Sequence, residues 1–180
     1  MSKYFLKSKF FFRRWLRAED GTAAVESALV FPMLLLLLLG TFDMGNGILA
    51  NQKTIRASQV VADLITRAES VSETDINEAI EAGRLAFETM TSDSYGVDVV
   101  SIRFDDDGDP AIVWRETRSM MPLADVLTRV ESVAEPNGGV VVVSVEYNFE
   151  PVFAGFVIDD ILMQEIAFAR GRESAVVNRL

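Results

Sequence analysis

The chain has 180 residues, with 27 acidic residues against 17 basic ones and a formal net charge of −10. It contains no cysteine and no histidine, which excludes disulfides, iron–sulfur clusters, thiolate zinc sites and every mechanism that depends on a histidine base. An acidic body does not neutralise phosphates, so we expect no nucleic-acid partner.

The first 21 residues form a basic leader. Residues 1–21 carry six Lys or Arg against two acidic residues, together with several aromatic residues, a composition suited to the headgroup layer of an anionic membrane. The remaining 11 basic and 25 acidic residues give the rest of the chain a net charge of −14. Basic residues beside a first apolar helix hold that side in the cytoplasm. We therefore expect a single-pass protein of a bacterial inner membrane with a periplasmic body.

An apolar segment follows the leader. Residues 22–42, built as a helix, would span about 31 Å, close to the roughly 30 Å of hydrocarbon in a bilayer. The only charged residue in this segment is Glu26, and the uninterrupted apolar part, 28–42, would reach only about 22 Å. In a helix that spans the bilayer, Glu26 therefore lies at the edge of the hydrocarbon. There Glu26 is either an interfacial residue held in the headgroups or a carboxylate that needs a partner.

The spacing of Gly21, Thr22 and Glu26 predicts what this partner is. A cut after Gly21 would give Thr22 a free, positively charged amine, and Glu26 of a neighbouring subunit could neutralise that amine in a bundle of low dielectric constant. Two alternatives stay open. The leader is retained as a signal anchor, or it belongs to a secretory signal that is cut near Gly45 and Gly47.

The segment that begins Gly21-Thr-Ala-Ala-Val-Glu-Ser-Ala-Leu resembles the processing site and helix of type IV prepilins. It is most similar to the TadE/TadG-like pseudopilins of tight-adherence (Tad/Flp) systems, over about residues 13–64. The resemblance implies a cut after Gly21 by a prepilin peptidase and docking through Glu26 to other pilin or pseudopilin subunits. It also implies a minor-pilin role in assembling pili for surface adhesion. Where the family commonly has an aromatic residue after the glutamate, this chain has Ser27.

Residues 43–70 are predicted to form a joint and a stalk helix. The glycines and Asn46 within Asp43–Gly47 suggest a helix irregularity at the membrane surface. Small and apolar residues then recur at steps of three and four, which predicts a helix that packs either on its own sheet or on neighbouring subunits. These residues are Ala50, Thr54, Ala57, Val61, Leu64 and Ala68.

Residues 71–180 are predicted to form an extracytoplasmic α+β domain. Ser72-Glu73-Thr74-Asp75 fits a capping box, and the pattern after it predicts a helix to about Glu88. A period of two from Val97 and the turn residues Asp105–Pro110 predict a hairpin of strands 97–104 and 111–116. The aspartates of Asp105–Asp109 could collect calcium ligands, but the EF-hand spacing is absent, and we favour a solvated turn.

The rest of the domain is predicted to be a short helix and two strands. Pro122–Val133 has helical spacing, Val140–Phe149 is the strongest strand pattern and should be central, and Gln164–Arg172 reads as the last strand after an apolar loop. Helices first and strands later give an α+β fold, with helices on one face of a mostly antiparallel sheet of about four strands. By the same resemblance, this architecture is pilin-like.

Glu146, in the predicted strand, and Glu150, the residue after that strand, lie four residues apart and so share one face. Two carboxylates on one face permit a glycosidase hypothesis, but no aromatic cleft accompanies them. We therefore expect no catalysis, no cofactor, no metal and no small-molecule substrate, with membrane lipid, a prepilin peptidase and other pilins as partners. The rival hypothesis is an uncleaved, membrane-anchored periplasmic binding or scaffold protein, and a periplasmic enzyme comes third.

Overall fold

The structure, a computed structural model, describes residues 20–87, 94–155 and 157–180. The chain forms two compact units that meet between Asp43 and Met44, and helix α2, Asp20–Ile65, contributes to both. Most of the predicted leader, and the predicted helix end at Glu88, lie outside the described residues.

Helix α2 differs in two ways from the prediction. The helix continues through residues 43–47, where an irregularity or a joint was predicted, and is not interrupted there. A single glycine inside a helix costs only about 1 kcal/mol relative to alanine. At Gly47 the missing side chain also lets the helix approach Phe149, whose Cε1 atom lies 3.5 Å from the position of an added Cβ. The helix ends at Ile65, so the last residue of the predicted stripe, Ala68, lies beyond it.

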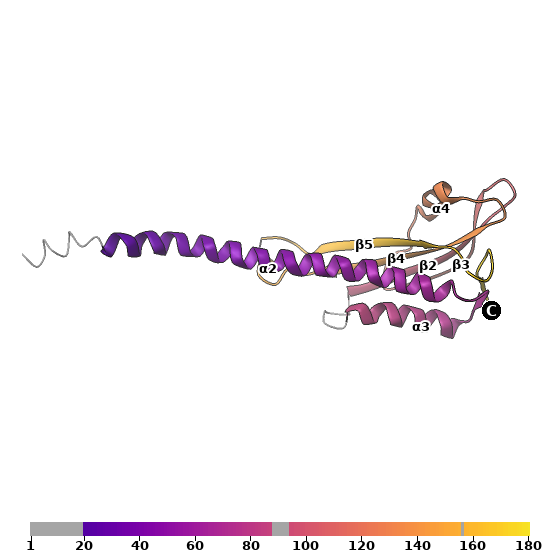
Figure 1. The fold of residues 1–180 in the computed structure, drawn as a ribbon, viewed down its shortest axis with the longest axis horizontal. Helices are drawn as coiled ribbons and strands as arrows, with labels where there is room; N and C mark the ends of the chain where they lie inside the picture. The colour runs from indigo at the N-terminus through magenta and orange to yellow at the C-terminus, as the bar shows by residue number, and fades with distance from the viewer. Residues whose placement is uncertain (1–19, 88–93, 156) are drawn as a thin grey trace, which may run out of the picture. The chain divides into compact units, whose positions relative to one another are not determined.

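The second unit contains the remaining helices and strands, as Figure 1 shows. In chain order they are β1 Ser70–Val71, α3 Glu73–Arg84, η1 Leu85–Phe87, β2 Tyr95–Phe104, β3 Pro110–Arg118, α4 Val126–Val130, η3 Glu131–Val133, β4 Gly139–Phe149, β5 Ile161–Ala169 and β6 Asn178–Arg179.

The capping box and the hairpin are confirmed. The Ser72 hydroxyl accepts a hydrogen bond from the Asp75 backbone N–H, and the Asp75 carboxylate accepts one from the Ser72 backbone N–H at 2.8 Å. Both bonds satisfy N–H groups that a helix start leaves without acceptors. Strands β2 and β3 pair antiparallel around a turn in which Gly108 has φ +88°.

Among the described residues, four strands form an antiparallel sheet in the order β3-β2-β4-β5. The predicted central position of β4 is confirmed, since it pairs with β2 on one side and β5 on the other. Strand β5 begins at Ile161 and ends at Ala169, three residues before the predicted range at each end. The pairing of Ile161 with Phe149 explains the earlier start, because it carries the ladder into a segment that has no clear alternation of its own.

The larger core lies between one face of the sheet and helices α2 and α3. The predicted small-residue stripe of α2 packs on this face, and Ala50, Thr54, Ala57 and Val61 are each fully buried. Alternate valines of β4 supply the facing surface. The stripe is therefore used inside the chain's own domain and is not available to neighbouring subunits.

A second, smaller core lies on the opposite face of the sheet, which corrects the prediction that helices cover one face only. Val126 and Val130 of α4 pack there against β2 and β4, with Ile102 and Phe104 at the centre. The helix is only five residues long, so its burial against the sheet, rather than its own propensity, accounts for its formation.

The C-terminal tail closes one end of the domain, and the sequence analysis did not predict this. Val177 is buried, and its carbonyl oxygen accepts hydrogen bonds from Trp114 Nε1 at 2.9 Å and from Ser101 Oγ at 2.7 Å. Just after it, β6 pairs parallel with β1. The tail thereby ties the connection after α2 to the sheet.

Gly83 lies within α3 where this helix packs against α2, and we expect that it cannot be replaced there without loss of stability. A Cβ atom there would lie 2.6 Å from Val61 Cγ2 and 2.7 Å from the Tyr95 hydroxyl, so Gly83→Ala should destabilise the domain by about 1–3 kcal/mol. Gly45→Ala is the matched control, because a Cβ at this helical glycine meets nothing within 4 Å and should stabilise by about 0.5–1 kcal/mol. Denaturant unfolding of the full chain in detergent measures both, and equal effects would contradict the close contact.

Candidate functional site

The predicted processing and docking residues lie in the first two turns of α2. The helix begins at Asp20, so Gly21 and Thr22 are in its first turn, and Glu26 is four residues after Thr22. Four residues advance a helix by about 6 Å and return to nearly the same face. Thr22 and Glu26 therefore occupy one side of the helix, one turn apart.

Gly21 has open space around it. An added Cβ would meet nothing within 4 Å, so a substitution there does not disturb packing within the chain. The first turn of a helix is also its most easily unwound part, because its N–H groups have no acceptors in the helix itself. A peptidase that needs an extended Gly21–Thr22 bond would have to unwind only this turn.

Glu26 lies among exposed apolar side chains. Within the part of the chain that the structure describes, its carboxylate forms no ion pair or hydrogen bond. Its neighbours Val25 and Leu29 are 61% and 71% exposed. A carboxylate in such surroundings is stable in water or in headgroups, but within hydrocarbon it needs a cation.

In the first half of α2, apolar side chains lie on every face of the helix, and they are exposed on every face. This helix, from Gly21 on, is long and apolar enough to cross a membrane, and among the described residues no other helix is. The Thr41 hydroxyl donates to the Leu37 carbonyl oxygen at 2.7 Å, which satisfies it without water. A helix with this character is stable in a bilayer. Its exposed large side chains include Val25, Leu29, Val30, Phe31, Met33 and the leucines at 34–38.

A protein-family model described as TadE-like protein matches residues 21–63. This stretch of the chain is TadE-like. The match begins at Gly21 and covers nearly all of α2, while the sheet and the remaining helices lie outside it. No curated protein and no solved structure matches the chain.

The TadE-like segment confirms the resemblance seen in the sequence. Together with the apolar helix, it supports a membrane-anchored protein with a minor-pilin-like role associated with a Tad pilus. The cut after Gly21 and the docking of Glu26 stay predictions.

Two other acidic residues singled out in the sequence, Asp105 and Glu146, form hydrogen bonds within the domain. The Asp105 carboxylate accepts hydrogen bonds from the backbone N–H groups of Asp107 and Asp109, at 3.0 and 2.8 Å, and so shapes the hairpin turn. Glu146 accepts a hydrogen bond from Gln164 Nε2 at 2.8 Å. Burial raises the pKa of Glu146, and the carboxylate of Asp98 raises it further. Glu150 follows the end of β4 and is exposed.

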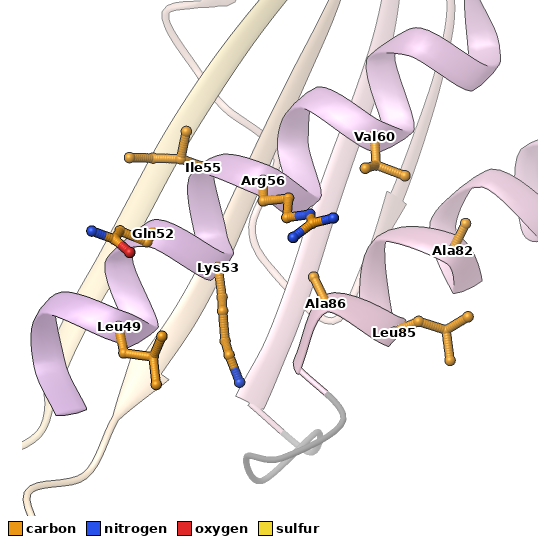
Figure 2. Close-up of a pocket in the computed structure, with 9 residues that line it drawn as sticks. All are labelled: Leu49, Gln52, Lys53, Ile55, Arg56, Val60, Ala82, Leu85 and Ala86. Carbon is orange, nitrogen blue, oxygen red and sulfur yellow. The ribbon is translucent and has the colours of Figure 1, made fainter.

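An open groove between α2 and the end of α3 was not predicted. It has a volume of about 670 Å3, and Figure 2 shows side chains from both helices around it. Leu49, Lys53, Arg56 and Val60 recur at steps of four and three, which places them on one face of α2. This spacing is visible in the sequence, but the prediction for this helix used only the stripe that faces the sheet. The α3 side adds Ala82, Leu85 and Ala86.

Proposed function

We propose that the protein is a minor pilin, or pseudopilin, of a Tad/Flp-type system that assembles pili for surface adhesion. The first half of α2 would hold it in the inner membrane, with the basic leader in the cytoplasm and the acidic domain in the periplasm. One observation carries the proposal. The TadE-like segment starts at Gly21 and contains an exposed apolar stretch of helix, residues 22–42, whose one carboxylate, Glu26, has no partner among the described residues.

In this proposal a prepilin peptidase cuts after Gly21, and the new amine of Thr22 pairs with Glu26 of an adjacent subunit. The pair forms at the edge of the hydrocarbon, where each charge alone is costly. Lateral packing of the helices then comes from van der Waals contact, since lipid gives apolar helices no hydrophobic reason to associate. The subunit joins the pilus through this helix.

The proposal makes the protein a structural subunit and assigns it no catalysis, cofactor or small-molecule substrate. Its partners are inner-membrane lipid, the prepilin peptidase and other pilin or pseudopilin subunits. The acidic domain remains outside the cytoplasm and, after assembly, forms part of the pilus surface.

The N-terminus of the mature protein tests the proposal. Protein purified from its native host should begin at Thr22 by intact mass spectrometry, and Gly21→Asp should keep all 21 leader residues. Gly45→Asp is the matched control, because Gly45 is also a helical glycine with open space around it, and it should be cut normally. An unchanged chain that begins at Met1 or Ser2 would instead support an uncleaved, anchored scaffold protein.

A further inference from the structure

The groove between α2 and α3 combines apolar walls with positive charge. Leu49 and Leu85, which lie on its two sides, are 45% and 49% exposed. Figure 2 shows the side chains of Lys53 and Arg56 extending from α2 into the space beside α3. Exposed leucines beside two cations fit a partner that is both apolar and acidic.

Arg56 and Arg103 are the two basic residues of this domain that form no hydrogen bond or ion pair with a described residue. Eleven basic residues follow Thr22, all within the described ranges, and eight of them form ion pairs with carboxylates of the domain. Arg56 has no hydrogen bond or ion pair to any described residue, although acidic residues outnumber basic ones by more than two to one. The eight paired residues are Arg67, Arg84, Arg115, Arg118, Arg129, Arg170, Arg172 and Arg179.

The β4–β5 loop has the complementary character. Val152, Val157 and Ile158 are 67%, 72% and 49% exposed, a concentration of exposed apolar side chains outside the membrane helix. Residues 150–160 include three acidic residues and no basic one. The acidic residues are Glu150, Asp159 and Asp160. The loop therefore offers apolar side chains and negative charge together.

The loop and the groove lie at the same level of α2 but on different faces. Gly47 faces one residue from each of the two strands that the loop connects, with Phe149 Cε1 of β4 at 3.5 Å and Met163 Cε of β5 at 3.8 Å from an added Cβ. Leu49, at the end of the groove, is two residues later, which is about 3 Å along the helix and roughly 200° around it. Both surfaces therefore belong to the part of the domain that surrounds residues 47–49 of α2.

We propose that the groove of one copy receives the β4–β5 loop of a second copy, with Val157 and Ile158 against Leu49 and Leu85, and Asp159 near Arg56. Because two different surfaces meet, the contact is head-to-tail and can continue from copy to copy as an open chain. This contact gives the pilin a lateral partner, a second copy of itself. The inference rests on the proposed function in one respect, which is that both copies are anchored in the same membrane.

Cysteine cross-linking tests the contact, and the chain is suited to it because it has no cysteine. Full-length, uncleaved protein carrying Ala86→Cys in the groove is mixed in liposomes with protein carrying Val157→Cys in the loop, and a short bismaleimide is added. The mixture should give a dimer of the two variants, and a chain with both substitutions should give a ladder of trimers and longer products. Each variant alone should give neither.

Thr74→Cys provides the control position, since it is exposed at the other end of α3. Cross-linking of Val157→Cys to Thr74→Cys at the same yield as to Ala86→Cys would overturn the proposal. Charge reversal gives the second test. Arg56→Glu should lower the yield by about tenfold, because like charges at a contact cost more than about 1.4 kcal/mol. Asp159→Arg on the other variant should restore it.

Two further outcomes would also overturn the proposal. A bimane label can be attached to Val157→Cys. If spin-labelled lipid quenches this label with or without the second copy, the loop inserts into the bilayer. Preferential cross-linking of Ala86→Cys to a different pilin in the native host would show that another subunit occupies the groove. Since the purified chain is uncleaved, these results do not depend on whether a peptidase cuts after Gly21.

Discussion

Glu26→Gln is expected to be cut like the unchanged protein and yet to be nearly absent from assembled pili. The substitution keeps the shape of the side chain and removes only its charge, so the amine of Thr22 would be left unpaired at the hydrocarbon edge. Removing one partner of a buried ion pair costs about 3–5 kcal/mol, which corresponds to a loss of about a hundredfold or more in assembly. Immunoblots of sheared pili and of membranes measure the two pools separately.

Two further variants serve as controls for this prediction. Glu73→Gln, in the exposed first turn of α3, makes the same chemical change far from the TadE-like segment and should assemble normally. Glu26→Asp keeps the charge on a shorter side chain and should assemble better than Glu26→Gln. Normal piliation by Glu26→Gln would make Glu26 an interfacial residue, and an uncut chain would move its role to peptidase recognition.

The elements that the sequence predicted well are those with local physical causes. The capping box at Ser72, the glycine turn at Gly108 and the alternating valines of β4 each depend on residues within a few positions of one another. The same holds for the N-terminal helix, whose apolar run predicts it directly. Such features are expressed in the sequence because neighbouring residues are sufficient to produce them.

The features that were missed depend on contacts between distant residues. The tail docks through the Val177 carbonyl, whose donors Ser101 and Trp114 lie 76 and 63 positions away. The end of α2 at Ile65 is similarly non-local, because the N–H of Arg172 donates to the Thr66 carbonyl just beyond it. Contacts between residues so far apart leave no periodic pattern in the sequence, so a single sequence does not reveal them.

The same division between local and distant features holds for the candidate site. Gly21, Thr22 and Glu26 could be proposed from the sequence because their spacing is local, and the family match covers the same residues, while their processing and docking roles stay predictions. The groove was missed, because its walls come from two helices that the fold brings together. The proposed docking residues could thus be predicted from the sequence, whereas the proposed lateral surface is visible only in the structure.

The largest stability effect in the domain is expected at Asp98, whose side chain is 1% exposed. Its carboxylate accepts hydrogen bonds from Arg115 Nε at 2.9 Å, from Arg115 Nη2 at 2.5 Å, from the Thr117 hydroxyl at 2.7 Å and from the Leu123 backbone N–H at 3.0 Å. These bonds hold the segment between β3 and α4 against the sheet. Asp98→Ala removes all four and leaves Arg115 without its carboxylate, so the free energy of unfolding should fall by about 3–5 kcal/mol.

The exposed pair of Asp125 and Arg129 is the matched control, because it is also an aspartate–arginine contact, at 2.9 Å, with both side chains about half exposed. Asp125→Ala should change stability by about 1 kcal/mol or less. Denaturant unfolding of the full chain in detergent compares the two variants. Equal small effects would show that the Asp98 network contributes little to the fold.

The pH dependence of Asp98→Asn separates the charge of Asp98 from its packing. Burial alone raises the pKa of Asp98, but the hydrogen bonds from Arg115, Thr117 and Leu123, with the charge of Arg115, outweigh it and hold the pKa below its ordinary value. A carboxyl group with a lowered folded-state pKa stabilises the protein above its unfolded pKa of about 3.9, and that stabilisation is lost as the pH falls through the folded-state value. The stability difference between the unchanged chain and Asp98→Asn should therefore be constant near neutral pH and shrink below about pH 4. A difference that stays the same in acid would mean that the charge of Asp98 adds nothing beyond its shape.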